Sequence, residues 1–285
     1  MSKSASERPP APEPLPHPVV DNHCHMDMGR GDTPALDPVD ALASAAEAGV
    51  GRIVQVGCDL AGSRWAVEAA NTYENVVAAV ALHPNEAPRL AADGALDAAL
   101  REIEALAQDP RVRALGETGL DYFRTDESGQ AAQHHSFRAH IEMAKRFDRT
   151  LMIHDRDAHE DVLRVLEEVG APERWVMHCF SGDADFARRC LDRGAYLSFA
   201  GTVTFKNAES LREALKIAPQ DRILVETDAP FLTPHPYRGK ENASYLIPLT
   251  MRVMAETRGD DLEALCAAVD ANTSAAYGGD WATAS

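Results

Sequence analysis

Eight short apolar segments, separated by longer segments with helical periodicity, place the strongest constraint on how this chain can fold. Short apolar runs are typical of strands that are buried on both faces of a parallel sheet. Eight strand–helix alternations in a chain of 285 residues predict a single (β/α)8 barrel, also called a TIM barrel. The predicted strands cover Val19–His25, Arg52–Gly57, Val76–Leu82, Val112–Glu117, Thr150–His154, Arg174–His178, Ala195–Phe199 and Arg222–Glu226.

Amphipathic segments between these strands indicate the helices. In the segment His159–Val169, apolar residues recur at helical spacing before a glycine that can end the helix. Ser128 is predicted to cap the helix over Ser128–Arg146. The other predicted helices cover Pro38–Ala48, Asp183–Asp192, Ala208–Ile217, Tyr245–Glu256 and Leu262–Ala268. A doubly wound open sheet is the alternative fold, but the sequence lacks a glycine-rich phosphate loop that would favour it.

The charge balance restricts the partners that the surface can bind. The chain has 28 Lys and Arg residues against 45 Asp and Glu residues, which gives a net charge of −17. A surface that coats nucleic acid needs many basic contacts to release counterions, so this composition disfavours such a surface. It still allows an enzyme that holds one or two phosphates inside a pocket.

The ends of the chain and its cysteines suggest where the protein works. Residues 1–17 are rich in Pro, Ser and charge, so we expect a disordered tail followed by one domain over residues 18–285. No segment is apolar enough to span a membrane, and the first residues lack the apolar centre of a signal peptide. Five cysteines without a CxxC pair favour a reducing compartment. We therefore expect a cytoplasmic monomer without a membrane partner.

Histidines and carboxylates fall at the ends of the predicted strands, where barrel enzymes carry their catalytic groups. Residues two apart in a strand project to the same side, so His23 and His25 can bind one cation. A carboxylate such as Glu117 can bridge two cations. The strand ends together supply a candidate metal site, with the residues His23, His25, Glu117, His154, His178 and Asp228.

Each member of this set also has a structural interpretation. A single histidine can be a buried core residue, Glu117 can cap a helix or form an ion pair, and Asp228 can form the turn before Pro230. The joint placement at strand ends favours metal ligands. Cys24 and Cys179 adjoin candidate ligands but should point away, so we interpret both as packing residues. Glu226 is a weaker candidate for a group that supports a ligand.

Several sequence segments resemble the TatD family of metal-dependent deoxyribonucleases, within the amidohydrolase superfamily. The resemblance spans the chain from about Val19 to the C-terminal helices. It is carried by Asp21-Asn-His-Cys-His25, Gly116-Glu-Thr-Gly-Leu-Asp-Tyr122, Ile153-His-Asp-Arg-Asp157, His178-Cys-Phe-Ser-Gly182, Glu226-Thr-Asp-Ala-Pro230 and Tyr237-Arg-Gly-Lys240.

The resemblance implies a site for two divalent ions, which could be Mg, Mn, Zn, Fe or Ni. His23 and His25 would bind the first ion with Glu117 and Asp228, while His154 and His178 would bind the second with Glu117. The implied activity is hydrolysis of phosphodiester bonds in DNA, with nucleotides removed from a 3′ end. The implied substrate is single-stranded DNA or the 3′ ends of DNA. The hypothesis is attack by a metal-bound hydroxide, with Asp228 accepting the proton.

Residues in the predicted loops could hold the substrate phosphate. The loop residues are Arg124, Arg156, Arg238 and Lys240. His83, at the end of the third predicted strand, could also reach the phosphate, although it is at least as well explained as a structural residue. The same metal site could instead hydrolyse an amide, ester or aminoacyl bond, because fold does not fix substrate. A non-catalytic metal-binding protein is a third alternative, and the presence of both Glu117 and Asp228 argues against it.

Overall fold

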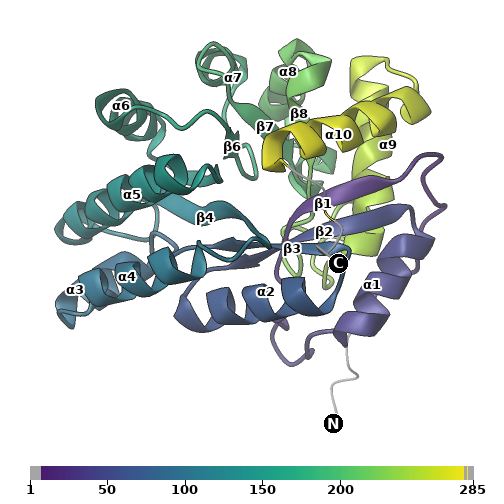
Figure 1. Cartoon of the computed structure of the whole chain (residues 1–285). Coiled ribbons are helices and arrows are strands. Elements are labelled where there is room, and N and C mark those ends of the chain that lie inside the picture. Colours follow the sequence, from purple (N-terminus) through teal and green to yellow (C-terminus); the bar gives the residue numbers. More distant parts are fainter. Residues whose placement is uncertain (1–7, 279–280, 282–285) are drawn as a thin grey trace, which may run out of the picture.

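The computed structural model describes residues 8–278 and 281. Within them, parallel strands alternate with helices that surround the sheet (Figure 1). The strands are β1 (Val19–Cys24), β2 (Val50–Gly57), β3 (Val76–Val80), β4 (Val112–Asp121), β5 (Thr150–Arg156), β6 (Trp175–Met177), β7 (Tyr196–Phe199) and β8 (Ile223–Val225). The helices are α1 (Pro38–Glu47), α2 (Leu60–Thr72), α3 (Glu86–Ala92), α4 (Leu96–Leu106), α5 (Glu127–Phe147), α6 (His159–Val169), α7 (Ala184–Leu191), α8 (Glu209–Ile217), α9 (Ile247–Arg258) and α10 (Leu262–Tyr277).

The sheet follows the chain order from β1 to β8, and every paired neighbour is parallel. The first and last strands meet through the residues that follow them. The amide of His25 donates to the Ala229 carbonyl at 2.8 Å, and the amide of Asp228 donates to the His23 carbonyl at 2.8 Å. The barrel therefore closes at its carboxyl end, and the predicted (β/α)8 fold is confirmed.

Alternation along the strands divides the apolar residues between two cores. Val54 and Val77 belong to the group inside the barrel, whereas their neighbours Ile53 and Val76 pack against the surrounding helices. This division follows from the two-residue period of a strand. Trp281 joins the inner group together with residues from the end of α10. The inside of the barrel is thus a packed core, which leaves its carboxyl end as the place for a site.

The structure differs from the sequence predictions in the region around β4. That strand runs past Glu117 to Asp121, because its last four residues pair with Ile153–Arg156 of β5. Asp126, rather than Ser128, caps α5 by accepting from the Ser128 amide at 3.0 Å. The helices α2, α3 and α4 were not among the predicted ones. Alanine and polar residues in α2 give it only a weak apolar stripe.

The N-terminal segment is better anchored than its composition suggests, and this corrects the expectation of a disordered tail for residues 8–17. Leu15 is 8% exposed and its amide donates to the Ala48 carbonyl at 3.1 Å. The Tyr245 hydroxyl donates to the Pro9 carbonyl at 2.6 Å. Residues 1–7 of the expected tail lie outside the described residues. Among the described helices, none combines the length and apolar character that crossing a bilayer requires.

Candidate metal centre

The carboxyl ends of five strands bring the six predicted ligands together. β1 carries His23 and leads to His25, β4 carries Glu117, and β5 carries His154. His178 follows β6, and Asp228 lies three residues after β8. All strands of a parallel barrel point the same way, so groups at their carboxyl ends share one face.

The Glu117 carboxylate is the centre of this cluster because its two oxygens face different partners. Oε2 lies 3.4 Å from Nε2 of His23. Oε1 lies 2.6 Å from Nδ1 of His154 and 3.3 Å from Nε2 of His178. Glu117 itself is only 4% exposed. One side chain therefore joins two groups of imidazoles.

His23, His25 and Asp228 form the group on the Oε2 side. The Nε2 atoms of His23 and His25 lie 3.1 Å apart. Oδ1 of Asp228 lies 3.6 Å from Nε2 of His23 and 3.5 Å from Nε2 of His25. Two imidazole nitrogens so close together cannot both direct a lone pair into the same space unless a proton or a cation lies between them.

Partners on the far side of the imidazoles set which nitrogen faces the cluster. Nδ1 of His25 donates to the Val56 carbonyl at 2.9 Å, which leaves Nε2 as the acceptor. Nδ1 of His178 lies 2.8 Å from Glu226 Oε1, an oxygen that also accepts from the Cys179 amide at 3.0 Å. Such outer partners orient metal-binding histidines and raise their basicity. Glu226, the weaker candidate for a supporting group, thus lies beside His178.

Asp21 fixes the loop that carries Asp228. Its buried carboxylate accepts from the Thr227 amide at 2.9 Å, from the Thr227 hydroxyl at 2.6 Å and from the Ser244 hydroxyl at 2.7 Å. Asp228 has a φ of 55°, in the left-handed region that is costly for a residue other than glycine. Burial raises the pKa of Asp21 to about 6, although these hydrogen bonds oppose the increase.

The electrostatics of the cluster favour a positive charge within it. Burial disfavours the charged form of Glu117, yet the charges of His178 and His83 hold its pKa well below the usual range. Burial also opposes the charged form of His154, but hydrogen bonds to Asp121 and Glu117 raise its pKa to about 9. The carboxylates therefore draw positive charge onto His154, and a divalent cation can supply the same charge.

A cavity of about 580 Å³ opens over the cluster. Arg124 and Arg156 line it, as do His83 and Asn85. Arg238 and Lys240 are not among the described residues that line it. Arg238 instead lies over the Phe205 ring, with its guanidinium carbon 4.5 Å from the ring centre.

Three residues belong to the site more closely than the sequence suggested. Nε2 of His83 lies 3.4 Å from Glu117 Oε1, within the cluster and not only at its mouth. Cys179, predicted to point away, lines the cavity and has a φ of 43°. Cys58 was not singled out, and its thiol lies 3.6 Å from Glu117 Oε2. All three directly follow predicted strands, so strand ends mark their positions, but the direction of each side chain is visible only in the structure.

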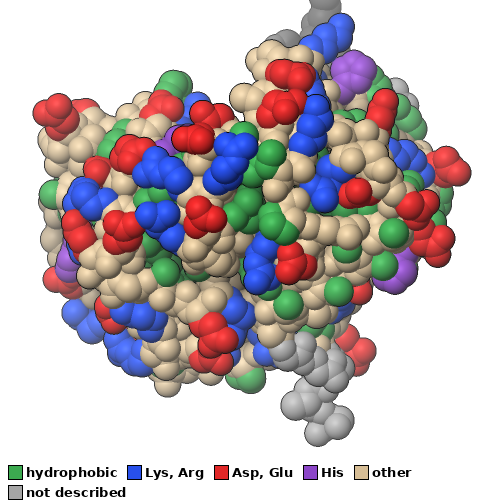
Figure 2. Space-filling view, turned by 90° about the horizontal axis from the view of Figure 1, so that it is seen from above, with side chains coloured by type: hydrophobic (Ala, Val, Ile, Leu, Met, Phe, Trp, Pro, Cys, Tyr) green, Lys and Arg blue, Asp and Glu red, His purple; other side chains and the backbone are tan. Residues whose placement is uncertain are grey.

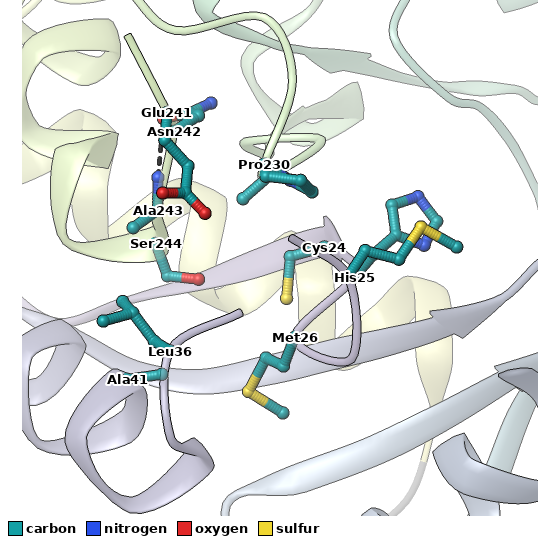
Figure 3. A pocket seen from close by; sticks show the side chains of 12 residues that line it. Cys24, His25, Met26, Leu36, Ala41, Pro230, Glu241, Asn242, Ala243 and Ser244 are labelled. Carbon is teal, nitrogen blue, oxygen red and sulfur yellow. Dashed lines mark hydrogen bonds between the residues drawn. The ribbon is translucent and has the colours of Figure 1, made fainter. Parts of the chain in front are cut away.

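Cys24 behaves as predicted and packs away from the cluster. It lines a separate small pocket with Met26 and Ser244 and is 1% exposed. Figure 3 shows the side chains of Cys24 and His25 leaving β1 in different directions. The alternation of a strand thus sends one neighbour into the packed interior and the other toward the cavity.

The donor set fits divalent metal ions. Within 4.8 Å of one another, ligand atoms come together in three groups among the described residues. These groups are His23, His25 and Glu117; His23, His178 and Glu226; and His83, Glu117 and His154. Mixed imidazole and carboxylate ligands suit several first-row metals, and a carboxylate can bridge a pair of ions.

A parallel barrel with this cluster at the carboxyl ends of its strands has the architecture of metal-dependent hydrolases. The chain belongs to the TatD related DNase family, whose family model matches residues 20–278, and is a metal-dependent hydrolase of that family.

Relatives of known name cover nearly the whole chain. One is described as the uncharacterized metal-dependent hydrolase TatD of Mycobacterium tuberculosis, 45% identical over 269 residues, with 92% of this chain and 99% of the relative covered. Another is the 3′-5′ ssDNA/RNA exonuclease TatD of Citrobacter rodentium, 33% identical, with 85% and 92% covered. The crystal structure of YjjV, a TatD homolog from Escherichia coli K12, has a TM-score of 0.83 and 27% identity, with 91% of this chain and 97% of that chain covered.

Proposed function

We propose that this protein is an exonuclease that removes nucleotides from the 3′ end of single-stranded DNA, with two divalent metal ions. The position of Glu117 carries the proposal, because its two oxygens face two separate groups of ligands. His23, His25 and Asp228 would hold the first ion, and His154 and His178 the second, with Glu117 shared between them. His83 lies close enough to Glu117 Oε1 to influence how Glu117 would bind the second ion.

The surroundings of the cluster favour a phosphate substrate. Arg124 and Arg156 line the cavity beside the ligands, and guanidinium groups match phosphate oxygens well. Over the face seen in Figure 2, basic side chains are interspersed with acidic ones. Such a surface supports binding of a strand end inside the cavity more than coating of a long duplex. The named activity of the Citrobacter rodentium relative agrees with this substrate.

Within this proposal, the bound ions would neutralise phosphate oxygens and lower the pKa of water in the site. The chain itself holds the reacting groups. Asp228, whose side chain is 17% exposed, would accept a proton from the attacking water. Arg124 and Arg156 would hold the nonbridging oxygens, and Asp21 would keep Asp228 in position through Thr227.

Activity and metal content test the proposal together. We expect protein loaded with Mn²⁺ or Mg²⁺ to shorten a 5′-labelled single-stranded oligonucleotide from its 3′ end. Glu117→Gln and Asp228→Asn should each lower kcat/KM by at least about 10³-fold. Glu117→Gln should also reduce the bound metal, measured by elemental analysis. Glu160→Gln is the matched control, because its carboxylate is 76% exposed on α6.

The same assays separate the competing chemistry. An aminoacyl ester and a simple amide are offered in parallel, because a site of this kind can also attack a carbonyl carbon. Hydrolysis of those substrates without any cleavage of DNA would contradict the proposed nuclease activity. Unchanged DNA cleavage in both variants would contradict the assigned metal site.

A further inference from the structure

The mouth of the cavity has two unlike walls. Apolar side chains of Met28, Phe231 and Leu232 line it together with His25. The cationic lining comes from Arg124 and Arg156, which follow β4 and end β5. Phe231 lies next to the His25 side of the cluster, with ring centres 6.4 Å apart. A ligand that fits both walls must combine an apolar surface with negative charge.

Phe231 is an exposed aromatic residue on a firmly held loop. Phe231 is 39% exposed, although large apolar residues are usually buried. The Phe231 amide donates to the Asp228 carbonyl at 2.8 Å, and its carbonyl accepts from the Asn242 side chain at 2.7 Å. Asn242 also donates to the Thr227 carbonyl at 3.0 Å. The backbone that carries the ring is thus held next to Asp228.

The opposite wall is ordered in a similar way. The guanidinium carbon of Arg156 lies 3.7 Å from the centre of the Phe123 ring. Stacking on an aromatic ring limits the rotation of an arginine and keeps its donors available at the edge. Arg156 is also two residues from His154, so it lies beside the second group of ligands. A phosphate at the cluster would therefore meet an arginine that is already in place.

We propose that Phe231 selects an unpaired terminal base by stacking against it. This inference rests on the proposed nuclease function and specifies its substrate. Every base has a π-face, so stacking on a fixed aromatic ring recognises single strands without reading their sequence. A base that remains paired in a duplex cannot offer that face. Phe231 is then a specificity residue, and the arginine wall binds the phosphate of the same nucleotide.

The test compares two oligonucleotides that differ only in the terminal base. One carries a normal nucleotide at the end that the enzyme attacks, and the other carries an abasic tetrahydrofuran analogue there. For the metal-loaded wild type, kcat/KM should be about tenfold higher on the normal oligonucleotide. Phe231→Ala should bring this ratio close to one, whereas Phe231→Trp should keep it. Val39→Ala is the control, because Val39 is 60% exposed on α1 and should leave the ratio unchanged.

Binding and folding measurements distinguish a loss of base stacking in Phe231→Ala from a loss of folding. Anisotropy with a phosphorothioate oligonucleotide should show a Kd about tenfold higher for Phe231→Ala, and thermal unfolding should show that this variant is folded. A wild type that cleaves both oligonucleotides equally, or a Phe231→Ala variant that keeps the preference, overturns the stacking proposal alone. A wild type that cleaves neither overturns the nuclease function as well.

Discussion

The two ends of the barrel use charged side chains in opposite ways. At the amino-terminal end, the Arg111 guanidinium donates to five backbone carbonyls, those of Ala70, Tyr73, Glu74, Val76 and Trp281. At the carboxyl end, imidazole nitrogens and carboxylate oxygens face one another around a cavity. Backbone acceptors contact every nitrogen of the guanidinium group, whereas the carboxyl-end cluster gains from an added cation. One end stabilises the fold and the other is available for chemistry.

Arg111→Met should give the largest effect at the amino-terminal end. Arg111 is 5% exposed, so its removal leaves several buried carbonyls without a donor. We expect a loss of about 4 kcal/mol in the free energy of unfolding, measured by urea denaturation. The activity of the folded protein should not change. Arg101→Met, on the exposed face of α4, is the control and should cost less than about 0.5 kcal/mol. A loss of activity in folded Arg111→Met would contradict the assignment of stability to one end of the barrel and chemistry to the other.

His140 contrasts with the histidines of the cluster, because the protein backbone already provides a hydrogen-bond partner for each of its ring nitrogens. Nε2 accepts from the Leu82 amide at 3.2 Å, and Nδ1 donates to the Ser136 carbonyl at 2.7 Å. Burial lowers the pKa of His140 to about 4. The unfolded chain therefore binds a proton from about pH 6.5 downward, while the folded protein resists it until about pH 4.

Stability should consequently fall as the pH drops through that window, and His140 should account for at most about 3 kcal/mol of the loss. Urea denaturation at several pH values measures it. Burial also lowers the pKa of His134, so the wild type is compared with His140→Gln, which cannot take up the proton of His140. If both proteins lose stability equally between pH 6.5 and 4, His140 is not the buried neutral group described above.

Glu226→Gln tests the outer layer of the metal centre. The substitution keeps the shape of a side chain that is 1% exposed but removes the charge beside Nδ1 of His178. We expect Mn²⁺ affinity, measured by calorimetry, and kcat/KM to fall by about 10- to 100-fold. The same change at exposed Glu160 should alter neither. Unchanged affinity in Glu226→Gln would mean that His178 needs no such partner.

The sequence predicted the fold because the eight apolar runs carry their own burial pattern. Segments such as Leu151–Ile153 are buried on both faces, and although one short apolar run could be misread, eight of them alternating with helical segments predict a barrel. The helices α2 and α3 were not predicted from the sequence, because α2 is rich in alanine and α3 is short. Their presence follows from the need to cover the strands, which is a property of the assembled barrel and not of the local segment.

The candidate site was predictable where a ligand sits directly on a strand end, as His154 does. It was not predictable where the side chain depends on a loop. Cys179 reaches the cavity with a φ of 43°, a backbone turn that the sequence does not reveal, and Arg238 lies over the Phe205 ring. Phe231 reaches the mouth because Asn242, eleven residues later, holds its carbonyl. Contacts of this kind need coordinates.

The hydrogen bonds between His23, His25 and the residues after β8 have a consequence for how the enzyme comes into being. The backbone of His23 and His25 forms the hydrogen bonds that close the barrel, and the side chains of the same two residues are the first pair of imidazoles. During synthesis, a nascent chain that has emerged only as far as β7 carries the four imidazoles of the predicted set but lacks the Asp228 and Ala229 that lock the first two in place. Asp228 therefore joins the cluster late, with closure of the ring, and a product that ends before β8 lacks it.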